Sequence, residues 1–179
     1  LVKVENGKTR MGQALNKAYF NSLASGSFLI GEDIVDPYGG AFKVTKGFST
    51  KFPGQVFSSS ISEAGMVGVS IGMALMGVQS FTEIMFGDFM TLTLDQLVNN
   101  ASKMHHMYAF QVDVPLRIRT PMGGKRGYGP THSQSLEKFF VGIDNVLTVA
   151  VSSLIDPKVT ISELQDVRCP AVIIENKMD

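Results

Sequence analysis

The chain has 179 residues, of which 44% are apolar and 18% charged, so it can bury one sizeable core but is too short for two full domains. Sixteen basic residues balance sixteen acidic ones, and this zero net charge excludes the basic surface that nucleic acid or an anionic membrane requires. The single cysteine, Cys169, excludes an internal disulfide and suits a reducing cytoplasm or an organelle matrix. We therefore expect one domain, residues 1–179, whose function comes from a local site.

The first predicted elements are a helix, a strand and a long loop. Apolar residues at helical spacing predict a helix from Thr9 to Ala24, and Phe28-Leu29-Ile30 is typical of a short buried strand. Turn-forming residues without a regular period predict a long surface loop from Asp36 to Gly54. Val56-Phe57 then predicts a second strand.

A glycine-containing helix is expected next. The uncharged run from Ala64 to Thr82 approaches the ~20 residues that span a bilayer. Its glycines and polar residues divide it into a helix and a following strand, so no membrane span is expected. Ser62 is expected to cap the helix. Gly65, Gly68 and Gly72 fall on one helix face, where another backbone can approach closely.

The remaining chain continues to alternate helices and strands. Asp88 is expected to cap a helix whose apolar stripe reaches Met104. Later elements are strands at 116–119, 146–151 and 171–175, a glycine-rich loop at 120–133, a short helix through Phe140 and a helix around 161–164. Short apolar strands between helices indicate an α/β fold: a three-layer parallel sheet with helices on both faces.

Ligands of such sheets gather beyond the carboxyl ends of the strands. The segments expected there hold Glu32, Glu63, the stretch from Met85 to Phe89 and the loop from Thr120 to His132. These segments form the candidate site.

Several short motifs of these segments follow one order along the chain. They are Gly31-Glu32-Asp33, Tyr38-Gly39-Gly40-Ala41-Phe42, Ile61-Ser62-Glu63, Glu83-Ile84-Met85-Phe86 and Thr131-His132-Ser133-Gln134-Ser135. With these motifs the chain resembles the beta chain of thiamine-diphosphate-dependent 2-oxo acid dehydrogenases of the pyruvate or branched-chain type. The beta chain is part of the decarboxylating component, and in some relatives it is the beta half of a fused chain. The resemblance runs from about Gly12 to Phe140. The resemblance implies a transketolase-like pyrimidine-binding domain. It weakens after Val141, so it assigns no potassium site.

The resemblance implies two catalytic residues. Glu63 matches the carboxyl group that lies beside the cofactor's pyrimidine ring and favours its imino tautomer, and apolar neighbours in the sequence suit that role. His132 matches a histidine that faces the reacting carbons, where it can steady a developing oxyanion or help pass the intermediate to a lipoyl group. Without the resemblance, Glu63 is better explained by the helix dipole and His132 as a solvated loop residue.

The resemblance also implies a binding site for thiamine diphosphate. Ile61, Met85 and Phe89, together with Glu63, match positions around the aminopyrimidine, although apolar residues at strand ends are ordinarily core. Glu32 matches an acidic residue that lies between paired active sites. The sequence contains no Gly-Asp-Gly motif with a downstream Asn, so the ligands of magnesium and of the diphosphate are expected from the alpha part.

The implied partners are an alpha chain or alpha half, a second beta part, the lipoyl domain of the acyltransferase component and a small 2-oxo acid. The implied location is the cytoplasm, or an organelle matrix in a eukaryote. The chain starts without methionine and stops directly after a strand-like run, so we expect a piece of a longer protein. The sequence leaves open whether the parent is fused and whether the acid is pyruvate, a branched-chain acid or acetoin-like.

Two other functions are compatible with the sequence. Transketolases and deoxyxylulose-phosphate synthases resemble this chain in their pyrimidine module and its glutamate, although the His-Ser-Gln-Ser loop argues against them. A non-catalytic assembly module would use the glycine-faced helix only to pair subunits. A dinucleotide-binding domain is disfavoured, because no Gly-x-Gly-x-x-Gly turn follows the first strand.

Overall fold

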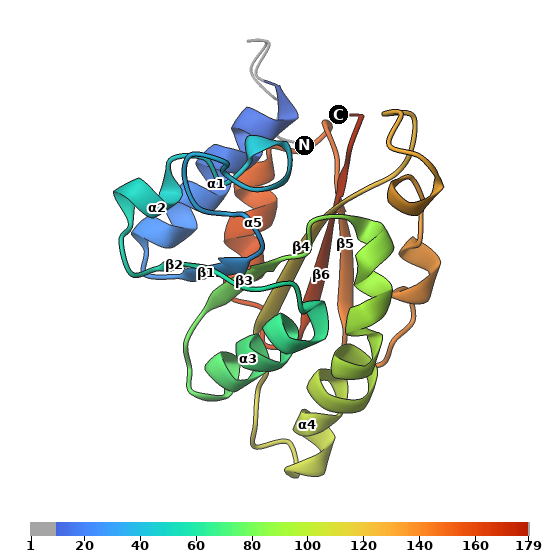
Figure 1. The fold of residues 1–179 in the computed structure, drawn as a ribbon. Helices are drawn as coiled ribbons and strands as arrows, with labels where there is room; N and C mark the ends of the chain where they lie inside the picture. Colours follow the sequence, from blue (N-terminus) through green and yellow to red (C-terminus); the bar gives the residue numbers. More distant parts are fainter. Residues whose placement is uncertain (1–9, 179) are drawn as a thin grey trace.

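A six-stranded parallel sheet in the order β2-β1-β3-β4-β6-β5 forms the centre of the molecule in the computed structural model, which describes residues 10–178. The strands are β1 (Phe28–Gly31), β2 (Val56–Ser58), β3 (Ser80–Glu83), β4 (Leu116–Met122), β5 (Leu147–Val151) and β6 (Ala171–Asn176). Helices cover both faces of the sheet (Figure 1). The prediction of a three-layer α/β fold with a parallel sheet is confirmed.

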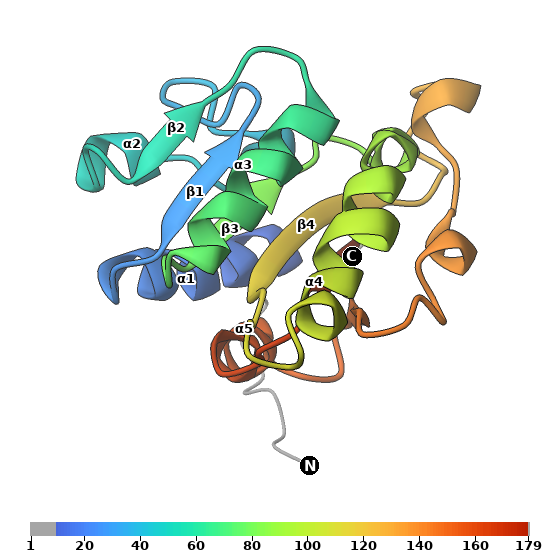
Figure 2. The same cartoon turned by 90° about the horizontal axis from the view of Figure 1, so that it is seen from below.

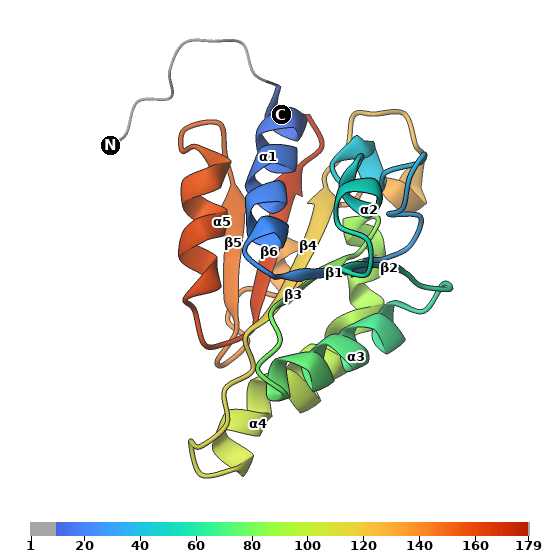
Figure 3. The same cartoon turned by 90° about the vertical axis from the view of Figure 1, so that its left-hand side faces the viewer.

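The two helical layers follow from the alternation of side chains along each strand. The helices are α1 (Met11–Ala24), α2 (Phe48–Lys51), α3 (Glu63–Leu75), α4 (Ser102–Met107) and α5 (Pro157–Gln165). Successive strand residues point to opposite faces. Ala171 and Ile173 therefore pack in the core under α1 and α5, while Val172 and Ile174 pack in the core under α3. Figure 3 separates the layer of α1, α2 and α5 from the layer of α3 and α4.

The long uncharged run from Ala64 to Thr82 divides as predicted into helix α3 and strand β3. Figure 2 shows α3 lying over β1 and β3. Between residues 10 and 178, no helix combines the length and the apolar character needed to cross a membrane.

The prediction of a surface loop from Asp36 to Gly54 is wrong in part. The segment contains α2 and a 3₁₀ turn, and Phe48 of α2 is fully buried. The Asp36 carboxylate organises it by accepting hydrogen bonds from the Thr50 hydroxyl at 2.6 Å and the Gly47 N–H at 2.7 Å. These bonds lower the pKa of Asp36 to about 2. Such local bonds from a side chain to the backbone create order without hydrophobic periodicity.

Both predicted helix caps are wrong. Ser62 precedes α3, but its hydroxyl donates and accepts no capping hydrogen bond. Asp88 lies inside a 3₁₀ segment, and its carboxylate accepts hydrogen bonds from the N–H and the side-chain amide of Gln134. The predicted helix is also not regular, since the 3₁₀ segment Gly87–Thr93 and the π segment Gln96–Ala101 precede α4. The remaining 3₁₀ turns are Ala41–Lys43, Pro130–His132 and Glu137–Phe139.

Arg119 of β4 is the centre of a buried ionic network. Its guanidinium, which is 0% exposed, pairs with Glu83 of β3 and Glu175 of β6. The Tyr19 hydroxyl of α1 donates to Glu175 at 2.8 Å, and the Ala41 N–H donates to Glu83 at 2.7 Å. Burial disfavours the charged guanidinium, but the attraction of the two carboxylates outweighs it and raises the pKa of Arg119 above its ordinary value. The network joins three strands, α1 and the segment after β1.

We expect Arg119→Met to destabilise the fold by about 3–5 kcal/mol, because it leaves two buried carboxylates without a partner. Denaturant unfolding measures the loss. Tyr19→Phe is the control, since it removes a single hydrogen bond and should cost about 1 kcal/mol. A loss below about 1 kcal/mol for Arg119→Met would show that the network does not hold the strands together.

Candidate functional site

Two buried carboxylates meet beyond the first strand. Glu32 follows β1 directly and is 7% exposed, and Glu63 opens α3 and is 6% exposed. Burial raises the pKa of Glu32, and the nearby charge of Glu63 raises it further. One Glu32 carboxylate oxygen, Oε1, is buried without a hydrogen-bond partner. The pair thus combines a protonatable acid with an unused hydrogen-bonding atom.

Gly31 allows the chain to turn into this acidic pair. It is the last residue of β1 and lies opposite Glu83 of β3 in the parallel register. A side chain at Gly31 would approach Ile34 Cγ2 to 2.7 Å and Glu83 Cβ to 3.0 Å. Only glycine therefore fits between the first strand and the Arg119 network, which fixes where Glu32 leaves the sheet.

His132 lies in an aromatic cluster beyond β3 and β4. The centroid of its ring is 4.8 Å from that of Phe86 and 5.3 Å from that of Phe89, with both rings nearly perpendicular to it. Phe86 also contacts Tyr128 and Phe42 at centroid distances of 5.8 and 6.2 Å. Two predicted site residues, Phe89 and His132, thus lie side by side. Phe86, whose ring contacts both, was not predicted as a site residue, because an apolar residue at a strand end is ordinarily part of the core.

The other two predicted binding residues lie nearby in the chain. Met85 is half-buried directly after Ile84 at the end of β3. Ile61, in the turn before α3, is 84% exposed and contacts no core cluster in the described chain. Within residues 10–178, no hydrogen bond joins the Glu32–Glu63 pair to the histidine cluster, although both lie beyond the carboxyl ends of parallel strands.

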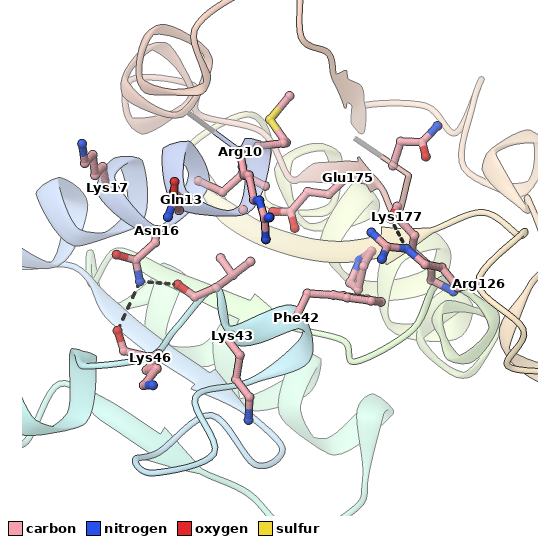
Figure 4. A pocket seen from close by; sticks show the side chains of 16 residues that line it. Arg10, Gln13, Asn16, Lys17, Phe42, Lys43, Lys46, Arg126, Glu175 and Lys177 are labelled. Carbon is pink, nitrogen blue, oxygen red and sulfur yellow. Dashed lines mark hydrogen bonds between the residues drawn. The ribbon is translucent and has the colours of Figure 1, made fainter. Parts of the chain in front are cut away.

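A separate basic cleft of about 1000 Å³ lies beside the first turn of α1. Figure 4 shows Arg10, Lys17 and Lys46 on one part of its wall and Arg126 with Lys177 on another. Its one acidic residue, Glu175, is neutralised by Arg119. None of the predicted site residues lines this cleft, so the cleft and the predicted chemistry lie apart.

The described residues provide no cluster of three or more His, Cys, Asp or Glu side chains that could hold a metal ion. What the site contains is an acid pair, half-buried apolar side chains and a histidine at one edge of the sheet. Such a set suits an uncharged ring whose polar edge faces a carboxyl group.

Several curated proteins are similar to this chain. It is 32% identical over 168 residues to the pyruvate dehydrogenase E1 component subunit beta-1, mitochondrial, of Arabidopsis thaliana, covering 92% of this chain and 46% of that protein. It is 34% identical over 179 residues to the 2-oxoisovalerate dehydrogenase subunit beta 2, mitochondrial, of Arabidopsis thaliana, covering 97% and 49%. The 2-oxoisovalerate dehydrogenase subunit beta of Pseudomonas aeruginosa is 33% identical over 150 residues, covering 83% and 43%.

The fold is also found in a solved structure described as a split gene transketolase, inactive beta4 tetramer. The TM-score is 0.68 at 16% identity, over 93% of this chain and 49% of that chain. The chain thus spans about half the length of the curated relatives and of the solved structure that it matches. Residues 8–179 match the family model described as transketolase, pyrimidine binding domain, and the chain belongs to this family.

Proposed function

We propose that the chain is the pyrimidine-binding half of a thiamine-diphosphate-dependent 2-oxo acid dehydrogenase, which decarboxylates a 2-oxo acid and transfers the acyl group to a lipoyl domain. The observation that carries the proposal is the buried Glu63 carboxylate at the start of α3, beside Glu32, in a member of the pyrimidine-binding family. Relatives above 30% identity that are named as beta subunits support it.

The residues present fit an aminopyrimidine ring. Met85 and Phe89 offer half-buried apolar surface, and Glu63 offers a carboxyl group for a ring nitrogen. Thiamine diphosphate, when bound, would supply a nucleophilic thiazolium carbon. The role of Glu63 is to hold a proton at the ring nitrogen, and the role of His132 is to stabilise negative charge on the substrate oxygen and to aid acyl transfer. The nearby charge of Glu63 raises the pKa of Glu32, so the two carboxyl groups interact.

The partners belong to the same proposal. An alpha chain or alpha half supplies the ligands of magnesium and of the diphosphate, since this sequence lacks the Gly-Asp-Gly motif. A lipoyl domain accepts the acyl group, and the enzyme works in the cytoplasm or, in a eukaryote, in an organelle matrix. Relatives named for pyruvate, 2-oxoisovalerate and acetoin leave the identity of the 2-oxo acid open.

A second copy of the chain is proposed to cover α3. The glycine face of α3, defined as Gly65, Gly68, Val69, Gly72 and Met76, lies on one side of the helix. Val69 is 60% exposed and Met76 is 80% exposed, and a side chain added at Gly72 would meet no described atom within 4 Å. This apolar, close-approach surface suits a neighbouring helix.

The central prediction concerns Glu63→Gln in the full assembly. Glutamine keeps the size and a hydrogen-bond acceptor but cannot hold the proton, so turnover should fall ~10²- to 10⁴-fold while the melting temperature stays nearly constant. Hydrogen exchange at the thiazolium carbon measures the chemical step. The exposed Glu163→Gln is the matched control. Normal exchange in Glu63→Gln with bound cofactor would leave Glu63 as a helix-dipole residue worth about 0.3–1 kcal/mol.

We expect the chain by itself to bind thiamine diphosphate poorly and to lack decarboxylase activity. Calorimetry with magnesium present tests this, and the same titration after mixing with an alpha partner is its positive control. Micromolar binding by the chain alone would contradict the division of ligands between two parts. Failure of the mixture to bind would favour the non-catalytic assembly module.

Gly72→Ala should weaken self-association while it stabilises the monomer by about 1 kcal/mol through helix propensity. Sedimentation measures the first effect and thermal unfolding the second. Gly12→Ala in α1, which likewise meets no described atom within 4 Å, is the control for propensity alone. A wild-type chain that sediments as a strict monomer would count against the second copy on α3.

A further inference from the structure

A buried lysine contacts the segment that carries His132. Lys177 follows β6 directly, and its side chain is 0% exposed. Its ammonium group donates a hydrogen bond to the His132 carbonyl oxygen at 2.6 Å. Burial lowers the pKa of Lys177, and the Asp88 carboxylate, 3.9 Å from the ammonium nitrogen, opposes the shift. A buried cation is costly, so its position calls for a structural or functional reason.

The backbone of Lys177 is fixed by the sheet. Its N–H donates to the Met122 carbonyl at 3.0 Å, which continues the pairing of Met122 with Asn176 in strands β4 and β6. Its own carbonyl oxygen accepts a hydrogen bond from Arg126 Nε at 2.7 Å, drawn as a dashed line in Figure 4. The side chain therefore extends from a rigid point towards the loop.

The loop itself has few other restraints near His132. Residues 125–131 are exposed, and Gly127 and Gly129 adopt positive φ angles. Inside this segment the His132 N–H reaches Gly129 O at a long 3.3 Å. Gln134 is held by two partners, since it donates to Asp88 and its carbonyl oxygen accepts from the Gly123 N–H at 3.2 Å. Lys177 is thus the direct link between the backbone of His132 and the sheet.

The same lysine also sets the surroundings of the imidazole. Its ammonium nitrogen lies 4.5 Å from the centroid of the Phe86 ring, whose edge-to-face partner is His132. Asp88 completes the group, because one oxygen faces Lys177 and the other accepts from Gln134. The ammonium group of Lys177 therefore contacts the His132 backbone directly, and it contacts the His132 ring and Gln134 indirectly, through Phe86 and Asp88.

We propose that Lys177 is the positioning residue of His132: its hydrogen bond to the His132 carbonyl, with Phe86 beneath the ammonium group and Asp88 beside it, holds the imidazole at the reacting edge of the sheet. The inference rests on the proposed function for the role of His132. The hydrogen bond between Lys177 and the His132 carbonyl lies within this chain and can be tested without that function. Lys177 touches neither substrate nor cofactor in this scheme.

The attachment is tested first on the chain itself. Lys177→Met keeps the apolar stem and removes the donor, so the amide hydrogen of His132, which is bonded to the Gly129 carbonyl, should exchange roughly tenfold faster, as expected for one lost charge-assisted hydrogen bond. The double variant Asp88→Asn/Lys177→Met should give the same increase without leaving a buried carboxylate unpaired, which guards against general unfolding. The exposed Lys138→Met is the control and should leave the His132 amide at the wild-type rate. Wild-type exchange at the His132 amide in the double variant would overturn the attachment.

The functional arm uses the full assembly with its alpha partner. Lys177→Met should lower kcat for acyl transfer ~10²-fold, the cost of a misplaced catalytic group, with KM for the 2-oxo acid nearly unchanged. Hydrogen exchange at the thiazolium carbon, the step assigned to Glu63, should stay at the wild-type rate. In a His132→Ala background, Lys177→Met should lower kcat no further, because both changes remove one function.

The outcomes separate the two proposals. A wild-type assembly that turns over no 2-oxo acid refutes the proposed function, while the exchange experiment on the chain still decides the attachment. Active wild type with kcat losses that multiply in His132→Ala/Lys177→Met overturns the positioning role. Loss of thiazolium-carbon exchange in Lys177→Met does the same, because it places the damage outside His132.

Discussion

Arg119 holds two carboxylates from the strands on either side of its own, and the carboxyl edge of the sheet depends on this contact. Glu83 and Glu175 lie at the ends of β3 and β6, the points at which the chain leaves the sheet for Phe86 and for Lys177. In a buried setting each charge needs the other, because an unpaired ion costs several kcal/mol. The strands therefore end in one fixed arrangement, and the loops of the candidate site start from it.

The candidate site has two parts that differ physically. Glu32 and Glu63 are both buried, beside β1 and α3, and burial raises the pKa of Glu32. The part around His132 is half-open, built from ring edges and a glycine-rich loop that is attached by Lys177. Ile61, in the turn before α3, is 84% exposed, which is consistent with the proposal that a partner completes the site.

The elements were predicted best where one physical rule acts alone. Buried parallel strands appear as continuous apolar runs, so β1 and β6 were evident, and the edge of the sheet at which Glu63 and His132 are predicted followed from the strand pattern. Ser62 and Asp88 were wrongly predicted as caps because local propensity was weighed without the competing contact, which for Asp88 is Gln134, 46 residues away. The prediction of a surface loop from Asp36 to Gly54 was wrong in part because the hydrogen bonds of one carboxylate, Asp36, order the segment, and such bonds leave no periodic pattern in the sequence.

The sequence by itself determined the α/β fold, the parallel sheet and, through the order of its motifs, the family, and it predicts Glu63, Phe89 and His132 as site residues. These features depend on periodicity and on neighbours along the chain, which a sequence displays directly. Only the tertiary structure decided that Arg119 pairs with Glu83 and Glu175, that Glu32 lies beside Glu63 and that Lys177 binds the His132 carbonyl. Each of these contacts joins residues separated by 31 to 56 positions or so, and a charged side chain gives no periodic signal of the partner that will neutralise it once both are buried.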